Sequence, residues 1–275
     1  MSNGSTQYQK LENRLLLLSW LNSLLGYEKN SELLEDMKQA EEGFDAQGRS
    51  HIYYRLISRG SKLKISADDL ARYDDNIRAH LAVINACRTQ PITLRYFQYL
   101  AALYTEIVLD RLFNHKAQLL ADLNAFVHER NASKLPGEPQ DEPFTEADLT
   151  KLAYWMATGS GKTLILHLNY YQFLHYNKEP LDNILLVTPN EGLSEQHLAE
   201  LAASGIPARR FDLNHGGLWS DSKHTVQVIE ITKLVEEKRG GGVSVPVEAF
   251  EGRNLIFVDE GHKGSGGEAW RKYRD

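Results

Sequence analysis

The chain has little of several features that would define a class of protein. One cysteine among 275 residues, Cys87, excludes an internal disulfide and fits a reducing, cytoplasmic location. A formal net charge of −6 gives no overall basic surface, although a local basic groove can still lie on an acidic protein. The longest leucine-rich run, residues 15–27, is too short to span a bilayer, and Ser19 and Asn22 interrupt it. These absences argue against a disulfide-stapled secreted domain and against a membrane partner.

The first half of the chain has the spacing of helices. Residues 66–88 place apolar side chains at steps of three and four, which lines one helix face, and Ser66 with Asp69 forms a capping-box start. Residues 92–113 predict a second long helix, apolar nearly all round and therefore buried on several sides. Cys87 lies among apolar residues, which favours a place in the core. We expect a helical N-terminal region, residues 1–90, that either packs on the rest of the chain or binds a partner through its leucine-rich helix.

The composition changes after residues 128–146, a stretch rich in proline and acidic residues that predicts a linker. Beyond it, short apolar runs alternate with segments of helical character, and continuous apolar strands of this kind are typical of a parallel sheet covered on both faces. The sequence therefore predicts an α/β fold in this part. The expected strands are residues 151–157, 183–189, 225–231 and 254–260.

The segment YWMATGSGKT, residues 154–163, carries most of the phosphate-loop pattern G-x-x-x-x-G-K-[ST], with Met156 at the position of the first glycine. Glycines permit the backbone angles that point successive N–H groups into one concavity, and a helix starting near Lys162 adds its positive end. Tyr154 and Trp155 precede the loop; a core position is favoured for them over base stacking. We predict a nucleotide site formed by Thr158, Gly159, Ser160, Gly161, Lys162 and Thr163.

An acidic pair, Asp259 and Glu260, follows the last apolar run. Open α/β sheets bind ligands at the carboxyl ends of their strands, where this pair is expected. Asp259 would hold Mg²⁺ opposite the Thr163 hydroxyl, and Glu260 would orient and deprotonate the attacking water. The predicted catalytic residues are therefore Glu260, Lys162 and Asp259, and the predicted metal ligands are Thr163 and Asp259.

Residues 159–163 and 259–262 resemble motifs I and II of superfamily 2 helicases and translocases, with Gly261 where alanine is usual. The string MATGSGKT is most similar to the restriction-enzyme branch, the type III Res subunits and type I motor subunits. The resemblance covers roughly residues 90–275. It implies a RecA-like P-loop sheet over residues 91–275 as a first motor domain, ATP hydrolysis with ATP and Mg²⁺ as cofactors, and double-stranded DNA as the partner.

Further roles follow from the resemblance alone. LLVTPNEGLSEQ and VIEITKL resemble motifs Ia and Ib, which implies nucleic-acid contacts at Pro189, Asn190, Gln196 and Thr232; ordinary strand-to-helix caps are the alternative. Gln98 matches a glutamine that helps to recognise adenine; the alternative is a plain glutamine on a helix surface. His262 matches the residue that couples nucleotide state to nucleic-acid binding; the alternative is a solvated histidine in a loop.

The resemblance also implies parts that these 275 residues do not supply: a second RecA-like domain with its arginines, and a Ser/Thr-Ala-Thr motif III. In the family, the strand before motif III lies between the motif I and motif II strands. We therefore expect a C-terminally incomplete first motor domain that lacks a central strand, truncated after motif II, with weak or no helicase activity of its own. A degenerate stand-alone ATP-binding protein is the alternative.

Two functions stay open at this point. The first is the N-terminal part of an ATP-dependent DNA helicase or translocase of a restriction or phage-defence system, with a methyltransferase or another defence-system subunit as a second partner. The alternative is a non-motor P-loop NTPase that acts as a switch or a phosphotransferase.

Overall fold

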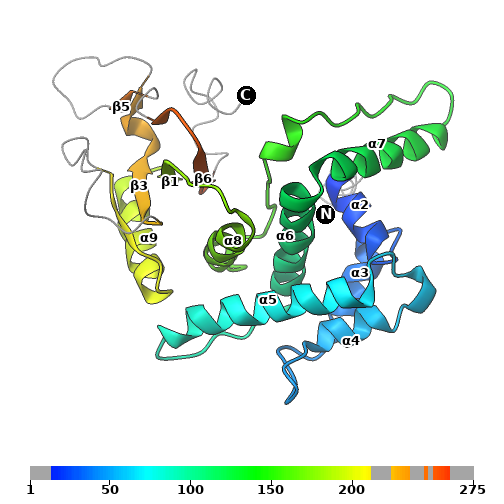
Figure 1. Cartoon of the computed structure of the whole chain (residues 1–275), viewed down its shortest axis with the longest axis horizontal. Coiled ribbons are helices and arrows are strands. Elements are labelled where there is room, and N and C mark those ends of the chain that lie inside the picture. The colour runs from blue at the N-terminus through cyan, green and yellow to red at the C-terminus, as the bar shows by residue number, and fades with distance from the viewer. Residues whose placement is uncertain (1–13, 212–223, 236–244, 247–249, 261–275) are drawn as a thin grey trace, which may run out of the picture. The chain divides into compact units, whose positions relative to one another are not determined.

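The computed structural model describes residues 14–211, 224–235, 245–246 and 250–260 (Figure 1). The chain forms two compact units, each built from two stretches of sequence: Met1–Leu81 with Ile92–Asn177, and Ala82–Pro91 with Lys178–Asp275. The expected boundary near residue 90 stays a prediction. Within the described residues, no helix is long and apolar enough to cross a membrane.

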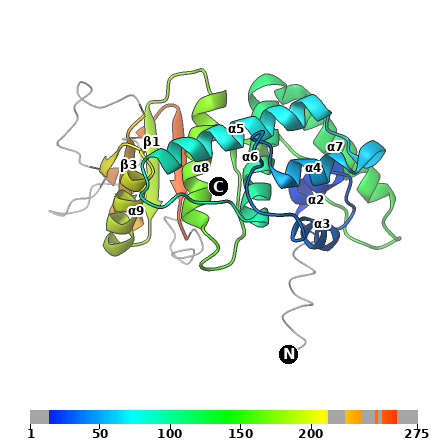
Figure 2. The ribbon, with the colours of Figure 1, turned by 90° about the horizontal axis from the view of Figure 1, so that it is seen from below.

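The first unit is helical. Its helix α6 packs against α3, α7 and α8, and it is buried along most of its length, as the apolar residues on all its sides predicted. Figure 2 shows α2, α3 and α4 grouped at one end of this unit. The elements are α2 (Leu16–Leu24), α3 (Asn30–Met37), α4 (His51–Ile57), η1 (Gly60–Lys62), most of α5 (Ala67–Ala86), α6 (Tyr96–Asn114), α7 (Lys116–Ala132), η2 (Asp148–Thr150) and α8 (Lys162–Tyr176).

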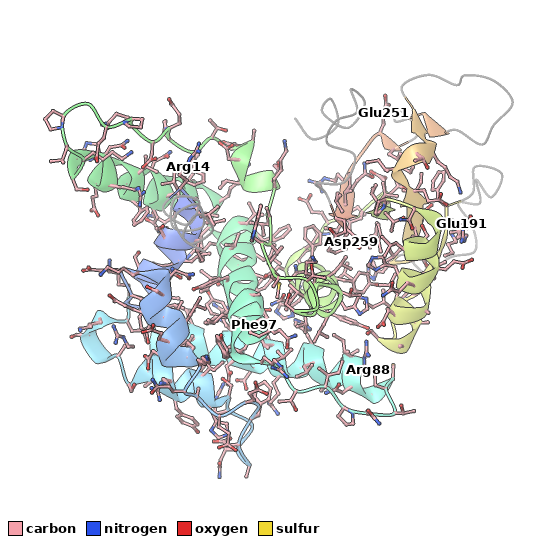
Figure 3. The ribbon with its side chains drawn as sticks, turned by 180° about the vertical axis from the view of Figure 1, so that it is seen from behind. Arg14, Arg88, Phe97, Glu191, Glu251 and Asp259 are labelled. Carbon is pink, nitrogen blue, oxygen red and sulfur yellow. The ribbon has the colours of Figure 1, made fainter. Side chains whose placement is uncertain are left out.

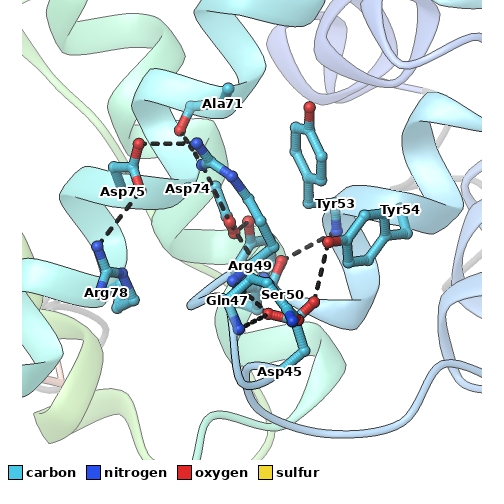
Figure 4. Close-up of polar contacts among 11 residues, drawn as sticks. Asp45, Gln47, Arg49, Ser50, Tyr53, Tyr54, Ala71, Asp74, Asp75 and Arg78 are labelled. Atoms are coloured by element: carbon cyan, nitrogen blue, oxygen red, sulfur yellow. Dashed lines mark hydrogen bonds and ion pairs between the residues drawn. The ribbon is translucent and has the colours of Figure 1, made fainter.

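The loop before α4 is tied to α5 and α6 through buried polar groups (Figure 4). Ser50 caps α4 by accepting a hydrogen bond from the Tyr53 backbone N–H at 2.9 Å. The Ser50 backbone N–H donates to Asp74 Oδ2 at 3.1 Å, and Arg49 lies 3.5 Å from the same carboxylate. Asp74 is fully buried and also accepts from the Tyr99 hydroxyl of α6. One carboxylate thus connects three helices of the unit.

A second polar cluster joins α5 to α6. Asp110 accepts hydrogen bonds from the Tyr73 hydroxyl at 2.6 Å, from Arg72 at 2.9 Å and from Asn114 at 2.7 Å. Burial works to raise the pKa of Asp110, but these three donors outweigh it, and the pKa lies below its ordinary value. One turn earlier on α6, burial raises the pKa of Glu106 despite the donors around it.

The second unit contains a four-stranded sheet in the order β2-β3-β1-β6, and all its pairings are parallel. Helix α9 packs against β1, β2 and β3. The expected runs 183–189, 225–231 and 254–260 form β1, β3 and β6, so the predicted α/β fold with a parallel sheet is confirmed. The bounds are β1 (Asn183–Thr188), α9 (Glu191–Ala203), β2 (Ala208–Arg210), β3 (Val226–Glu230), η4 (Ile231–Lys233), β4 (Leu234–Val235), β5 (Val245–Pro246) and β6 (Asn254–Val258); β4 and β5 form a separate pair.

The register of the sheet brings three strand ends to one edge. Thr188 of β1 pairs with Glu230 of β3, and Val187 pairs with Val258 of β6. The residues that follow β1, β3 and β6 therefore share the carboxyl edge of the sheet, where α/β proteins bind ligands. An apolar cluster lies on one side of these strands and includes Leu185, Val187, Ile229 and Phe250, with Phe211 and Ile231 packed against it.

The prediction of a strand over residues 151–157 is wrong. This segment has no strand assignment, and the Trp155 side chain is 78% exposed, so its expected core position is wrong as well. Among the described residues, β6 pairs with β1 alone and leaves Ile256 and Val258 half-exposed. An apolar run becomes a strand only where a neighbouring strand supplies partners for its backbone N–H and C=O groups.

Two smaller expectations also change. Cys87 is exposed rather than buried, because it follows Ala86, the last residue of α5, and lies beyond the apolar face that ends at Ile84. Helix α7 continues to Ala132, so the first residues of the expected linker are helical.

Candidate functional site

The phosphate loop has the backbone that its sequence predicted. Gly159 and Gly161 both have positive φ, +77° and +86°, and the Ser160 N–H donates to the Ala157 carbonyl at 3.1 Å. Gly161 is the N-cap of α8, which begins at Lys162. The N–H groups of the first helical turn have no partner within their own helix, so this end of α8 can bind an anion.

The side chains around this turn fit a nucleoside triphosphate with Mg²⁺. The Ser160 hydroxyl is buried and has no hydrogen-bond partner among the described residues. Lys162 and Thr163 stand in the first turn of α8 and are partly exposed, and Thr158 is exposed. This set offers an ammonium group and a hydroxyl, the groups that hold phosphate and Mg²⁺ in P-loop proteins.

No group of three or more His, Cys, Asp or Glu side chains suited to a metal ion occurs in the part of the chain that the structure describes. Mg²⁺ beside a nucleotide usually takes one or two protein ligands and completes its shell with phosphate oxygens and water. One or two oxygen ligands from the protein therefore suffice in number for such an ion.

Gln98 lies against the phosphate loop. Its Nε2 donates to the Ser160 carbonyl at 2.8 Å, and its Oε1 accepts from the Arg95 backbone N–H at 3.0 Å. The side chain is 8% exposed. A Cβ placed on Gly161 would lie 2.5 Å from Gln98 Nε2, so the glycine is needed for this close approach as well as for its φ. Gln98 thus belongs to the loop structurally, while its expected contact with adenine stays a prediction.

The segment before the loop is held by a hydroxyl pair. The Tyr154 and Thr105 hydroxyls form a hydrogen bond of 2.6 Å, and Thr105 Oγ1 also donates to Asn169 Oδ1 at 3.2 Å. Tyr154 therefore contacts α6 and, through Thr105, α8. Base stacking by the exposed Trp155 stays an open alternative.

In the second unit, the acidic pair follows β6 at the carboxyl edge of the sheet. The Asp259 backbone N–H donates to the Val187 carbonyl at 3.0 Å, which continues the pairing of β6 with β1. Glu260 has φ +51° and is the one non-glycine residue with positive φ within the described ranges. Side chains rarely adopt this conformation, and such strain concentrates at functional sites.

The sequence did not point to His197, which contacts the acidic pair. His197 lies on α9, and its Nε2 is 2.9 Å from Asp259 Oδ2. Ser194, His197 and Leu201 are the buried residues of α9 and recur at steps of three and four. The polar residue His197 on this buried stripe was the sequence feature that could have indicated the contact. Figure 3 labels Asp259 and also Glu191, the first residue of α9.

Three of the predicted nucleic-acid residues, Pro189, Asn190 and Thr232, follow strands at the same edge of the sheet, and Gln196 lies on α9. Asn190 caps α9 by accepting from the Leu193 N–H at 3.0 Å, and its side chain is exposed. Gln196 and Thr232 are exposed, and Pro189 is half-buried. Thr188, in contrast, is buried, and its hydroxyl pairs with that of Ser194 at 2.6 Å, which holds the turn between β1 and α9.

The structure therefore assembles the predicted residues in two groups. Thr158–Thr163 and Gln98 lie together in the first unit. The second unit brings Pro189, Asn190, Thr232, Asp259 and Glu260 to one sheet edge, with Gln196 on α9. His262 lies outside the described residues.

Comparison with known proteins identifies a family for the chain. The sequence matches the family of type III restriction enzymes, res subunit, over residues 111–274. No curated protein matches, and no solved structure matches. The matched residues include both the phosphate loop and the acidic pair and make up more than half of the chain. The chain thus belongs to the type III restriction enzyme Res-subunit family, whose domain is that of a superfamily 2 helicase.

Proposed function

We propose that the chain is the ATP-binding and ATP-hydrolysing part of a DNA helicase or translocase that serves a restriction or phage-defence system. The Res-subunit family implies an ATP-dependent nucleic-acid motor domain. One observation best supports ATP as the ligand: Gly159 and Gly161 both have positive φ, and they lead directly into the N-terminus of α8 at Lys162.

Each side chain then has a role set by its chemistry. Lys162 and the N–H groups of the loop bind the phosphates, and Gln98 holds the loop through the Ser160 carbonyl. Thr163 and Asp259 bind Mg²⁺. Bound ATP would supply the phosphoryl group that water attacks, with ADP as the leaving group. Glu260 orients that water and accepts its proton.

Nucleic acid is proposed to cross the carboxyl edge of the sheet in the second unit. Asn190 and Thr232 present an amide and a hydroxyl there, and Gln196 presents a second amide on α9. Such groups suit contacts to a phosphate backbone without reading sequence. Double-stranded DNA is the proposed substrate, and a methyltransferase or another defence-system subunit is the proposed protein partner.

Equilibrium nucleotide binding tests the phosphate site. A fluorescent ATP analogue is titrated into the 275-residue chain with Mg²⁺. Lys162→Ala is expected to weaken binding at least tenfold, because it removes the charge that faces the phosphates. Lys151→Ala is the matched control, since Lys151 is an exposed lysine just before the loop. Equal loss in both variants, or no binding by the unaltered chain, would contradict the proposal.

The nucleic-acid partner is tested by hydrolysis and binding together. ATP turnover is measured alone, with duplex DNA and with RNA, and binding of a labelled duplex is followed as salt rises. Stimulation by duplex DNA and a salt-dependent affinity are expected. Nucleotide binding without a response to any nucleic acid would instead favour the non-motor switch or phosphotransferase.

A further inference from the structure

We propose that His197 is a positioning residue that holds Asp259 in the orientation needed to bind Mg²⁺. The inference rests on the proposed function, because Asp259 is a metal ligand only if the chain binds a nucleotide with Mg²⁺. It starts from one contact in the second unit: His197 Nε2 and Asp259 Oδ2 lie 2.9 Å apart although the residues are distant in sequence.

The direction of this hydrogen bond follows from the chemistry of the two groups. An ionised carboxylate only accepts, so the imidazole proton that makes the bond is on Nε2. His197 is 2% exposed, and its Nδ1 has no hydrogen-bond partner within the described part of the chain. The one polar contact found for this buried ring is therefore directed at Asp259.

Asp259 is consequently anchored from two elements. Its backbone N–H donates to Val187 of β1 at 3.0 Å, and its side chain accepts from His197 of α9. Fixing one carboxylate oxygen also fixes the direction of the other. A carboxylate that is ordered in advance binds a cation more tightly, since less rotamer entropy is lost on binding.

Conservative variants separate the hydrogen bond from the packing of the ring. His197→Leu replaces the imidazole with an apolar side chain of related size and so removes the hydrogen-bond donor. His197→Gln keeps an N–H group near the position of Nε2. Leu201→Ala is the matched packing control, because Leu201 is fully buried on the same face of α9 one turn later.

The main measurement is the Mg²⁺ concentration that half-saturates binding of the fluorescent ATP analogue, with thermal unfolding recorded beside it. His197→Leu is expected to raise that concentration about tenfold, and His197→Gln to raise it less than about threefold. Leu201→Ala is expected to lower the unfolding temperature and leave the half-saturating Mg²⁺ within about twofold of the unaltered chain. In an Asp259→Asn background, His197→Leu is expected to add nothing.

A second measurement is independent of the nucleotide. Imidazole ¹H–¹⁵N spectra of the metal-free chain are expected to show His197 with its proton on Nε2, and Asp259→Asn is expected to shift that signal. A proton on Nδ1, or no response to Asp259→Asn, would overturn the positioning role.

The outcomes distinguish this inference from the function on which it rests. If the unaltered chain binds the nucleotide in a Mg²⁺-dependent way and His197→Leu leaves the half-saturating Mg²⁺ unchanged, the positioning role fails and the proposed function stands. The same holds if Leu201→Ala raises the half-saturating Mg²⁺ as much as His197→Leu does. If the unaltered chain binds no nucleotide at all, both fail.

Discussion

At the scale of single residues, the phosphate loop depends on its two glycines for different reasons. A Cβ on Gly159 would meet no atom within 4 Å, so that position needs glycine only for its φ of +77°. A Cβ on Gly161 would also meet Gln98 Nε2 at 2.5 Å. That atom is the end of a flexible side chain, so Gln98 can move away, but it then loses its hydrogen bond to the Ser160 carbonyl.

This difference gives a prediction with an internal control. Gly159→Ala and Gly161→Ala should each cost about 1 kcal/mol of stability for the left-handed backbone. Gly161→Ala should cost about 1 kcal/mol more, for the displaced hydrogen bond. The free energy of unfolding in urea, measured for both variants, checks this.

The Gln98→Ala background decides whether the extra cost comes from this contact. With Gln98 shortened, Gly159→Ala and Gly161→Ala are expected to destabilise the chain equally. If Gly161→Ala keeps its extra cost without Gln98, the close approach is not its cause.

At the scale of elements, the spacing of apolar residues predicted a helix or strand correctly where that spacing alone decides which side chains are buried. The apolar runs of β1, β3 and β6 and the start of α8 at Lys162 lie where the sequence indicated. The prediction of a strand over residues 151–157 was wrong because a strand also needs a neighbouring strand to pair with, and the sequence of one apolar run does not reveal that neighbour. The His197 contact was missed for the same reason, since it joins α9 to a residue after β6.

The pairing of α5 with α6 carries a pH-dependent contribution to stability. The pKa of Asp110 is lowered in the folded chain, because Arg72, Tyr73 and Asn114 outweigh the effect of burial. A carboxyl whose pKa is lower in the folded state stabilises the fold above its unfolded pKa, about 4, and this stabilisation is lost as pH falls through the folded value. Asp110→Asn should therefore cost about 2 kcal/mol at pH 7, with a smaller difference below pH ~4.

Urea unfolding of both chains between pH 7 and pH 3 measures this difference. Asp122→Asn is the matched control, because Asp122 pairs with Arg111 at 3.1 Å and is 35% exposed. Asp122→Asn should lower the free energy of unfolding by less than about 1 kcal/mol. A gap between the unaltered chain and Asp110→Asn that stays constant down to pH 3 would show that the carboxyl titrates alike in the folded and unfolded states.

At the scale of the whole molecule, the first unit is assembled from residues on both sides of position 90. Tyr104 of α6 donates to Asn22 of α2, and the Arg111 guanidinium lies 5.0 Å from the centre of the Trp20 ring. Asn76 of α5 donates to Glu106 of α6 at 2.9 Å, in a region where Glu106 is fully buried. The leucine-rich helix α2 directs Trp20, Leu21 and Leu24 into this unit, which favours packing within the chain over a free partner-binding face.

These contacts predict that residues 91–275 do not fold well without residues 1–90. Deletion would remove the partners that Asp110 and Glu106 have on α5, and it would expose the apolar side chains of α6 and α7 that pack against α3 and α2. Exposing apolar surface costs about 25 cal/mol per Å². We expect residues 91–275 to be insoluble or to unfold without a cooperative transition. Co-expression of residues 1–90 as a separate chain should restore solubility, cooperative unfolding and Mg²⁺-dependent nucleotide binding. If residues 91–275 alone unfold cooperatively and bind the nucleotide as tightly as the whole chain, residues 1–90 are a separable region, and their role as a partner-binding module becomes the better explanation.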